Sequence, residues 1–101
     1  MLENHPQPQD IKLENVLFAL GNPLRLAIVQ TLAQQGEQSC GVLRGDTAKS
    51  TMTHHWRVLR ESGVIWQRPL GRENLISLRQ ACLETRFPGL LPTLLKALAQ
   101  N

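Results

Sequence analysis

The feature that most constrains the fold is an amphipathic helix that leads directly into a β-hairpin. The helical pattern covers residues 50–60, and Gly63 ends it before the β-rich run 64–66. Residues 69–72 (Pro-Leu-Gly-Arg) have the composition of a turn, and residues 75–78 indicate a returning strand. A hairpin in this position is typical of a wing attached to a helix-turn-helix unit.

Two helical patterns precede this unit. The first covers residues 11–20, and Gly21 ends it in the manner of a glycine cap. The second opens at Asn22-Pro23, because Asn is a favoured N-cap and Pro suits the first helical position. Its apolar stripe comprises Leu24, Ile28 and Leu32, widened by Leu26, Val29 and Ala33.

Two weaker patterns complete the helices. Residues 37–45 predict a short third helix, interrupted by Gly41 and Gly45. The breaker at residues 87–89 precedes a terminal helix that starts near Leu90 or Leu91, so that Pro92 lies in its first turn, where proline is tolerated.

The length of 101 residues suffices for one hydrophobic core and one domain. Residues 1–10 hold two prolines and several polar residues, which predicts a flexible N-terminal arm, and residues 11–101 form the domain. The expected fold is mainly α with a β-hairpin wing: an α+β winged helix-turn-helix with about five helices and a two-stranded wing.

Basic residues are concentrated in the middle of the chain. Residues 44–79 contain seven basic and three acidic residues, a local charge of +4, whereas the remainder holds four basic and five acidic residues. An ordinary solvated surface and a polyanion partner explain this asymmetry equally well, since phosphate neutralisation by Lys and Arg drives nucleic-acid binding.

The helix over residues 50–60 has two distinct faces at about 100° per residue. One comprises Met52, His55, Trp56 and Leu59, and the opposite one comprises Ser50, Thr53, His54 and Arg57, flanked by Arg60. Short hydroxyl and imidazole side chains allow close approach to base edges, and Arg binds guanine or phosphate. The helix N-terminus near Lys49 adds backbone donors for a phosphate oxygen. A merely solvated face would favour Glu–Lys pairs, which are absent, so DNA recognition is the preferred interpretation.

Residues 22–28 (NPLRLAI), residues 49–65 (KSTMTHHWRVLRESGVI) and the following hairpin resemble the bacterial ArsR-type winged helix-turn-helix repressors. The resemblance covers about residues 16–78. It implies a homodimer on an inverted-repeat operator in double-stranded DNA, with one recognition helix in each of two major grooves and the wings over flanking phosphates or the minor groove. The expected DNA-binding residues are Lys49, Ser50, Thr51, Thr53, His54, Arg57, Arg60, Arg68 and Arg72.

The sequence departs from the metal-sensing members of this family. Cys40 stands where their paired cysteines would lie, but Val42 occupies the partner position, and the terminal helix lacks the Asp and His ligands of the zinc-type site. One thiolate cannot hold such an ion, so we expect no metal and no cofactor. A small buried hydrophobe is the favoured role of Cys40, over a site or a redox pair shared with Cys82 and His5. Adjacent His54 and His55 point about 100° apart, so His54 faces DNA and His55 the core margin.

Two apolar seams suggest how a dimer forms. The first helix and the last helix each carry a leucine-rich stripe, and contacts within one chain do not obviously bury both stripes. We expect them to pair across a two-fold axis rather than only within one subunit. The expected interface residues are Leu13, Val16, Leu17, Leu20, Leu90, Leu91, Leu94, Leu95 and Leu98.

Other classes of protein fit less well. No apolar run approaches the ~20 residues that span a bilayer, and the N-terminus lacks the regions of a secretory signal, so we expect a cytoplasmic protein with no membrane role. The main alternative is a winged-helix module that binds another protein. A hydrolase or redox enzyme that uses Cys40 and a histidine is disfavoured, because no nucleophile motif surrounds Cys40 and the fold leaves little room for a pocket. We therefore expect no enzymatic activity.

Overall fold

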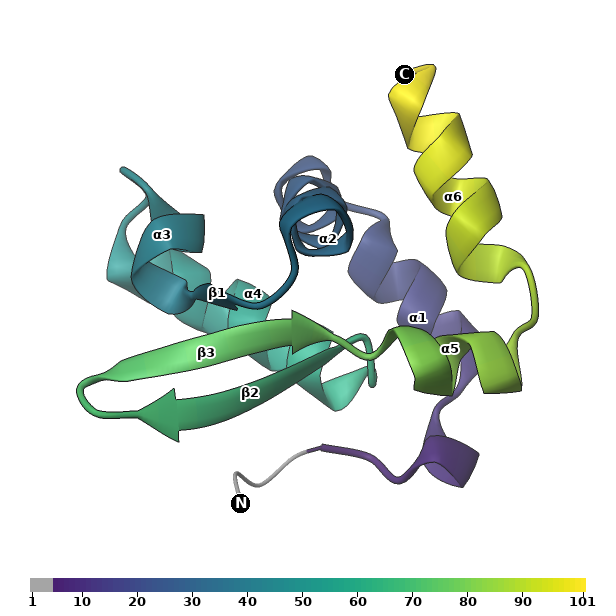
Figure 1. Cartoon of the computed structure of the whole chain (residues 1–101), viewed down its shortest axis with the longest axis horizontal. Coiled ribbons are helices and arrows are strands. Elements are labelled where there is room, and N and C mark those ends of the chain that lie inside the picture. The colour runs from purple at the N-terminus through teal and green to yellow at the C-terminus, as the bar shows by residue number, and fades with distance from the viewer. Residues whose placement is uncertain (1–4) are drawn as a thin grey trace.

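The computed structural model describes residues 5–101, which form six α-helices and a three-stranded antiparallel sheet after one turn of 3₁₀ helix at Pro8–Asp10 (Figure 1). The helices are α1 (Leu13–Leu20), α2 (Pro23–Gln35), α3 (Cys40–Arg44), α4 (Lys49–Glu61), α5 (Gln80–Arg86) and α6 (Leu90–Ala99). The strands are β1 (Gln38–Ser39), β2 (Ile65–Leu70) and β3 (Glu73–Leu78). The predicted mainly α winged fold is confirmed, with one helix and one strand more than expected.

The wing is the hairpin of β2 and β3. These strands pair from Ile65 opposite Leu78 to Leu70 opposite Glu73, which leaves a two-residue turn containing Gly71. The additional strand β1 pairs with the other edge of β3, so the sheet order is β1-β3-β2. A two-residue strand is too short to show an alternating pattern, which explains why the sequence did not predict it.

The predicted start of α2 is confirmed. The Asn22 side chain accepts hydrogen bonds from the backbone N–H groups of Leu24 and Arg25 at 2.9 and 3.1 Å. Two details differ from expectation. Gly21 follows α1 with φ of −83° and is no left-handed cap. The stripe that α2 buries contains Arg25 together with Ile28, Val29 and Leu32, whereas Leu24 is only half-buried.

The core lies between the helices and the inner face of the wing. Its α4 members are Met52, Trp56 and Leu59, as the amphipathic pattern predicts. Gly63 turns the chain from α4 toward β2 with φ of +85°, a conformation that favours glycine. A Cβ at this position would also lie 2.6 Å from the buried side chain of Ile11, so Gly63 is required for packing as well as for backbone geometry.

The two chain ends differ in part from expectation. His5 and Pro6 of the expected arm accept hydrogen bonds from Gln67 and Arg79, and the 3₁₀ turn at Pro8–Asp10 packs against α5, while residues 1–4 fall outside the described part. The helix α5 was not predicted, because it is short and Leu83 is its only buried residue. The terminal helix starts at Leu90 with Pro92 in its first turn, as predicted.

Within residues 5–101 no single helix is long and apolar enough to cross a membrane, and α1 and α2 reach that length only as a pair bent by 101°.

Candidate nucleic-acid interface

The face of α4 opposite the core is exposed. Lys49, Ser50, Thr51, Thr53, His54 and Arg57 are all solvent-exposed, whereas Met52, Trp56 and Leu59 are buried. Because the buried side chains fix both the position and the rotation of the helix, the polar side chains project in a defined direction. The structure thus brings six of the nine expected DNA-binding residues together on one outward surface, which we call the recognition face.

Two hydrogen bonds refine this surface. The hydroxyl of Thr53 donates to the carbonyl of Lys49 at 3.0 Å, so its oxygen still has acceptor capacity. Arg60 is half-buried, and its Nη1 donates to Oε1 of Gln67 on β2 at 2.8 Å. Arg60 therefore links α4 to the wing and is less exposed to solvent than Arg57.

The two wing arginines differ in their surroundings. Arg68 faces away from α4, because it alternates with Gln67, whose partner Ile76 faces the core. Its guanidinium forms a two-pronged ion pair with Glu37 at 2.9 and 3.1 Å. Arg72 at the turn is exposed and forms no ion pair with an acidic group in residues 5–101. Arg72 is thus the more available phosphate contact.

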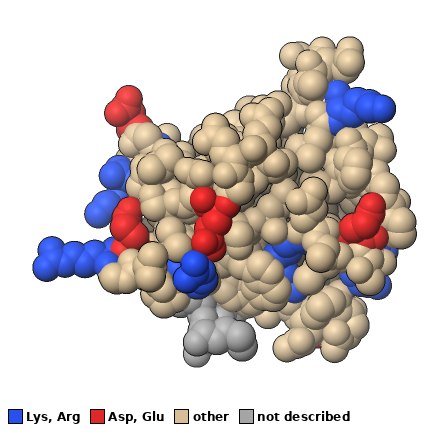
Figure 2. Space-filling model, viewed as in Figure 1, with Lys and Arg blue, Asp and Glu red and all other residues tan. Residues whose placement is uncertain are grey.

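A groove lies between α3, α4 and the wing, and we call it the wing groove. Its volume is about 580 Å³, and its lining includes five basic residues and one acidic residue, Glu73. The basic residues are Arg44, Lys49, Arg57, Arg60 and Arg72. Figure 2 shows basic side chains projecting from this end of the molecule, where α3 and the wing turn lie. Lys49, Thr53 and Arg57 belong to both the recognition face and the wing groove, so the two surfaces adjoin.

A buried arginine ties α4 to the rest of the core. Nε and Nη2 of Arg25 donate to the carbonyls of Ala19 and Phe18 at 2.6 and 3.2 Å, at the end of α1, and its Nη1 lies 3.1 Å from Nδ1 of His55. A guanidinium can only donate, so Nδ1 of His55 is the acceptor. Burial, then the charge of Arg25 and then His54 hold the pKa of His55 below its usual value.

This arrangement predicts a pH dependence of stability. Because the pKa of His55 is lowered in the folded state, the unfolded chain binds a proton more readily as pH falls below about 6.5. We expect the free energy of unfolding to decrease from about pH 7 to pH 5. His55→Asn should flatten that decrease, because the amide oxygen can still accept from Arg25 and does not titrate. Urea denaturation at several pH values measures both chains, and equal pH slopes would contradict this role for His55.

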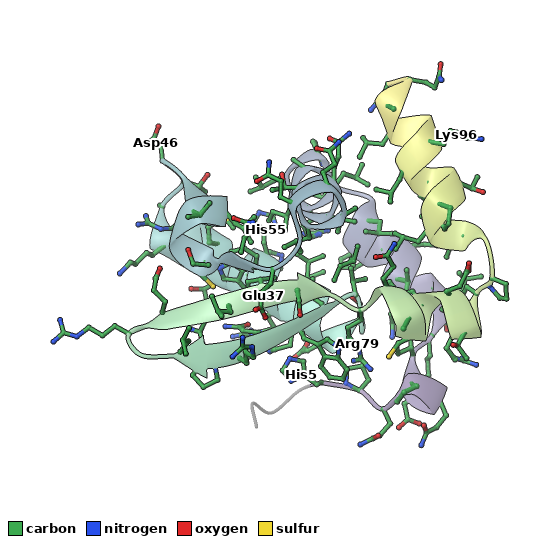
Figure 3. The ribbon with its side chains drawn as sticks, in the orientation of Figure 1. His5, Glu37, Asp46, His55, Arg79 and Lys96 are labelled. Atoms are coloured by element: carbon green, nitrogen blue, oxygen red, sulfur yellow. The ribbon has the colours of Figure 1, made fainter. Side chains whose placement is uncertain are left out.

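The wing is held from its outer side by the segment before α1. Arg79 is buried, its Nη1 donates to the carbonyl of Pro6 at 2.9 Å, and its guanidinium carbon lies 3.6 Å from the ring centroid of Trp66. The backbone N–H of Gln67 donates to Nε2 of His5 at 3.0 Å. Figure 3 shows His5 and Arg79 side by side next to the hairpin. These contacts hold the segment before α1 against β2 and the end of β3.

The surroundings of Cys40 suppress ionisation of its thiol. Burial and then the carboxylate of Glu73 raise the pKa of the Cys40 thiol to about 11, so it stays protonated at neutral pH. Within residues 5–101 no cluster of three or more His, Cys, Asp or Glu side chains could hold a metal ion. Both Cys40 and Cys82 are free thiols.

The structure divides the expected dimer-interface residues into three groups. Val16, Leu20 and Leu91 are buried in the core of a single chain. Leu90, Leu94, Leu95 and Leu98 are half-buried. Leu13 and Leu17 are 42% and 46% exposed, and the neighbouring Phe18, which the sequence-based list omitted, is 65% exposed. The available apolar surface is therefore centred on the outer face of α1.

Sequence reasoning missed Arg25 and Arg79 as positioning residues, and Arg44 and Glu73 as parts of the wing groove. Arg25 carried a usable signal, because it stands three, four and seven residues before Ile28, Val29 and Leu32 on one helical face. A charged residue in a buried stripe implies specific acceptors. The groove residues come from separate elements and left no local pattern.

Comparisons with known proteins agree with this architecture. Residues 20–68 match the family described as a helix-turn-helix domain. The chain is 35% identical over 91 residues to the uncharacterized HTH-type transcriptional regulator YceK of Bacillus subtilis (strain 168), across 87% of this chain and 91% of that protein.

Two solved structures are similar as well. The transcriptional repressor BigR from Xylella fastidiosa superposes with a TM-score of 0.58 at 32% identity, over 74% of this chain and 85% of that one. An ArsR family transcriptional regulator superposes with a TM-score of 0.68 at 22% identity, over 88% and 97%, a likeness in fold. These relatives are regulators, so the alternative of an enzyme built on Cys40 is set aside. The chain belongs to the helix-turn-helix transcriptional regulators, and it shares its fold with an ArsR family regulator.

Proposed function

We propose that this chain is a homodimeric repressor that binds an inverted-repeat operator in double-stranded DNA. The recognition face of α4 carries the proposal: hydroxyl, imidazole and guanidinium groups project from a helix whose other face is locked in the core. Lys49 and Arg57 form no ion pair with an acidic group in residues 5–101, so their charges are available to DNA.

In this proposal α4 of each copy lies in a major groove. Thr53 and His54 contact base edges, Arg57 binds a guanine or a phosphate, and Arg72 contacts the flanking backbone or the minor groove. The two half-sites of a dimer lie about one helical turn, ~34 Å, apart. Residues 11–101 act as one DNA-binding domain in the cytoplasm. The similarity to BigR, a transcriptional repressor, favours repression over activation.

The surface around α1 supports the dimer. Leu13, Leu17 and Phe18 are exposed there, and an apolar groove of about 360 Å³ lies between α1, α2 and α6. Its lining includes Leu17, Leu26, Leu94 and Leu98. Exposed apolar side chains beside an apolar groove form a self-complementary surface, as a two-fold interface requires. The partner that we propose for this surface is a second copy of the chain.

Leu17→Glu is expected to make the protein monomeric at micromolar concentration and to weaken operator binding at least tenfold. The reason is that a carboxylate placed in this interface would be desolvated without a partner. Sedimentation equilibrium measures the mass, and Thr85→Glu on the exposed side of α5 is the matched control. A dimeric Leu17→Glu protein with normal operator affinity would disprove this interface.

The function itself is tested by recovering bound fragments of genomic DNA and measuring affinity for them at several salt concentrations. We expect a shared inverted repeat and a steep loss of affinity as salt rises, because phosphate contacts release counterions. Arg72→Ala should weaken binding to all sequences and reduce the salt slope by about one. Arg68→Ala should have a smaller effect, since Glu37 already pairs with Arg68. Binding that ignores both salt and sequence would refute the proposal.

A further inference from the structure

The wing groove combines an apolar floor with a cationic rim. Its volume of about 580 Å³ lies within the ~300–1,000 Å³ of small-molecule sites. The edge of Trp56, 8% exposed, forms the apolar part of its floor above the buried Met52, and the thiol of Cys40 adds a further weakly polar wall. DNA phosphates meet exposed cations but offer nothing apolar to such a floor. The groove therefore has an apolar floor that phosphate binding alone does not require.

The charge in the wing groove is unbalanced. Five basic side chains line it against the single carboxylate of Glu73, and none of the five is ion-paired with an acidic group in residues 5–101. Arg44 donates to the carbonyl of Thr47 at 3.1 Å and Arg60 donates to Gln67, bonds that hold the guanidinium groups in place without neutralising them. An anionic ligand would supply the missing charge.

We propose that the wing groove binds a small aromatic carboxylate, with the ring against the exposed edge of Trp56 and the carboxylate toward Lys49 and Arg57. Both basic residues also belong to the recognition face and cannot neutralise a ligand and a phosphate at once. Ligand and operator are therefore mutually exclusive, and the ligand is an inducer. This last step rests on the proposed function, whereas ligand binding itself does not.

The probe for ligand binding is 2-naphthoate, followed by NMR at the indole N–H of Trp56 and the methyl group of Met52. We expect saturable binding of one molecule per chain that shifts both resonances. Neutral 2-naphthamide should bind at least tenfold more weakly, because it lacks the charge that the rim recognises. No saturable shift, or equal binding of the amide, would overturn the proposal.

Two substitutions locate the site. Asn74 lines the wing groove on β3, and Asn74→Phe should fill the groove and weaken naphthoate binding at least tenfold. Ser77→Phe, on the same strand with similar exposure but facing the other way, should change it less than twofold. Glu73→Gln at an exposed position should tighten binding severalfold by removing a like charge. Equal effects of the two Phe variants, or no tightening by Glu73→Gln, would contradict the assigned site.

A competition experiment separates the two proposals. Naphthoate should displace the wild-type protein from its recovered operator, whereas Asn74→Phe, studied at the protein concentration that gives equal operator occupancy, should show no displacement. Naphthoate binding without any DNA binding would refute the proposed function and leave the site standing. DNA binding without naphthoate binding would refute the ligand site and leave the proposed function standing. Simultaneous binding of naphthoate and operator would disprove mutual exclusion.

Discussion

Met52→Lys is expected to abolish the folded state. The Met52 side chain is 1% exposed, on the face of α4 that packs into the core. A lysine there either buries an unpaired ammonium group or loses its proton, and the effective penalty is several kcal/mol. That is comparable with the total stability of ~5–15 kcal/mol of a small domain. Circular dichroism and tryptophan fluorescence should show an unfolded chain at 25 °C.

Thr51→Lys provides the matched control. Thr51 is the preceding residue of the same helix and is exposed, so the same new charge should leave the fold intact. A surface substitution of this kind changes stability by only about 0.5 kcal/mol. A stable Met52→Lys protein would show that the two faces of α4 are assigned the wrong way round.

Arg57→Ala is expected to weaken operator binding about 10- to 100-fold at fixed salt, the equivalent of roughly 1–3 kcal/mol for one arginine contact. Arg57 is exposed at the centre of the charged surface, on both the recognition face and the wing groove. The fold should be unaffected, because the side chain is exposed. Fluorescence anisotropy with the recovered operator measures the change.

Lys96→Ala removes the same charge from α6, well away from α3 and the wing (Figure 3), and should change affinity less than twofold. If Arg57→Ala bound the operator as tightly as the wild type, the alternative of a protein-interaction module would be favoured instead.

The elements with a clear periodicity could be predicted from the sequence. The helix α4, the capped start of α2 and the wing each have a pattern within a few consecutive residues, and each was found. By contrast, β1 and α5 are too short for a pattern, and pairing with β3 or attachment to its end determines them. The third predicted helix, with its interrupting glycines, is confirmed as the five-residue α3.

The candidate site was predictable to a similar extent. Helical rotation alone separated exposed Thr53 and His54 from buried Trp56. It could not show that Glu37, 31 residues away, pairs with Arg68, or that Gln67 engages Arg60. Nor could it show that Val16 and Leu91 fill the core of one chain rather than an interface. Such contacts depend on which elements the fold brings together, and local patterns do not encode them.

The most direct test of base recognition by α4 is selection of bound sequences from one random duplex pool with the wild-type protein and with His54→Ala. Wild-type protein should select an inverted repeat, and His54→Ala should lose its preference at one position, the same in both half-sites. If both proteins selected the same motif with the same preferences, or if neither selected a motif, base recognition by this face of α4 would be contradicted.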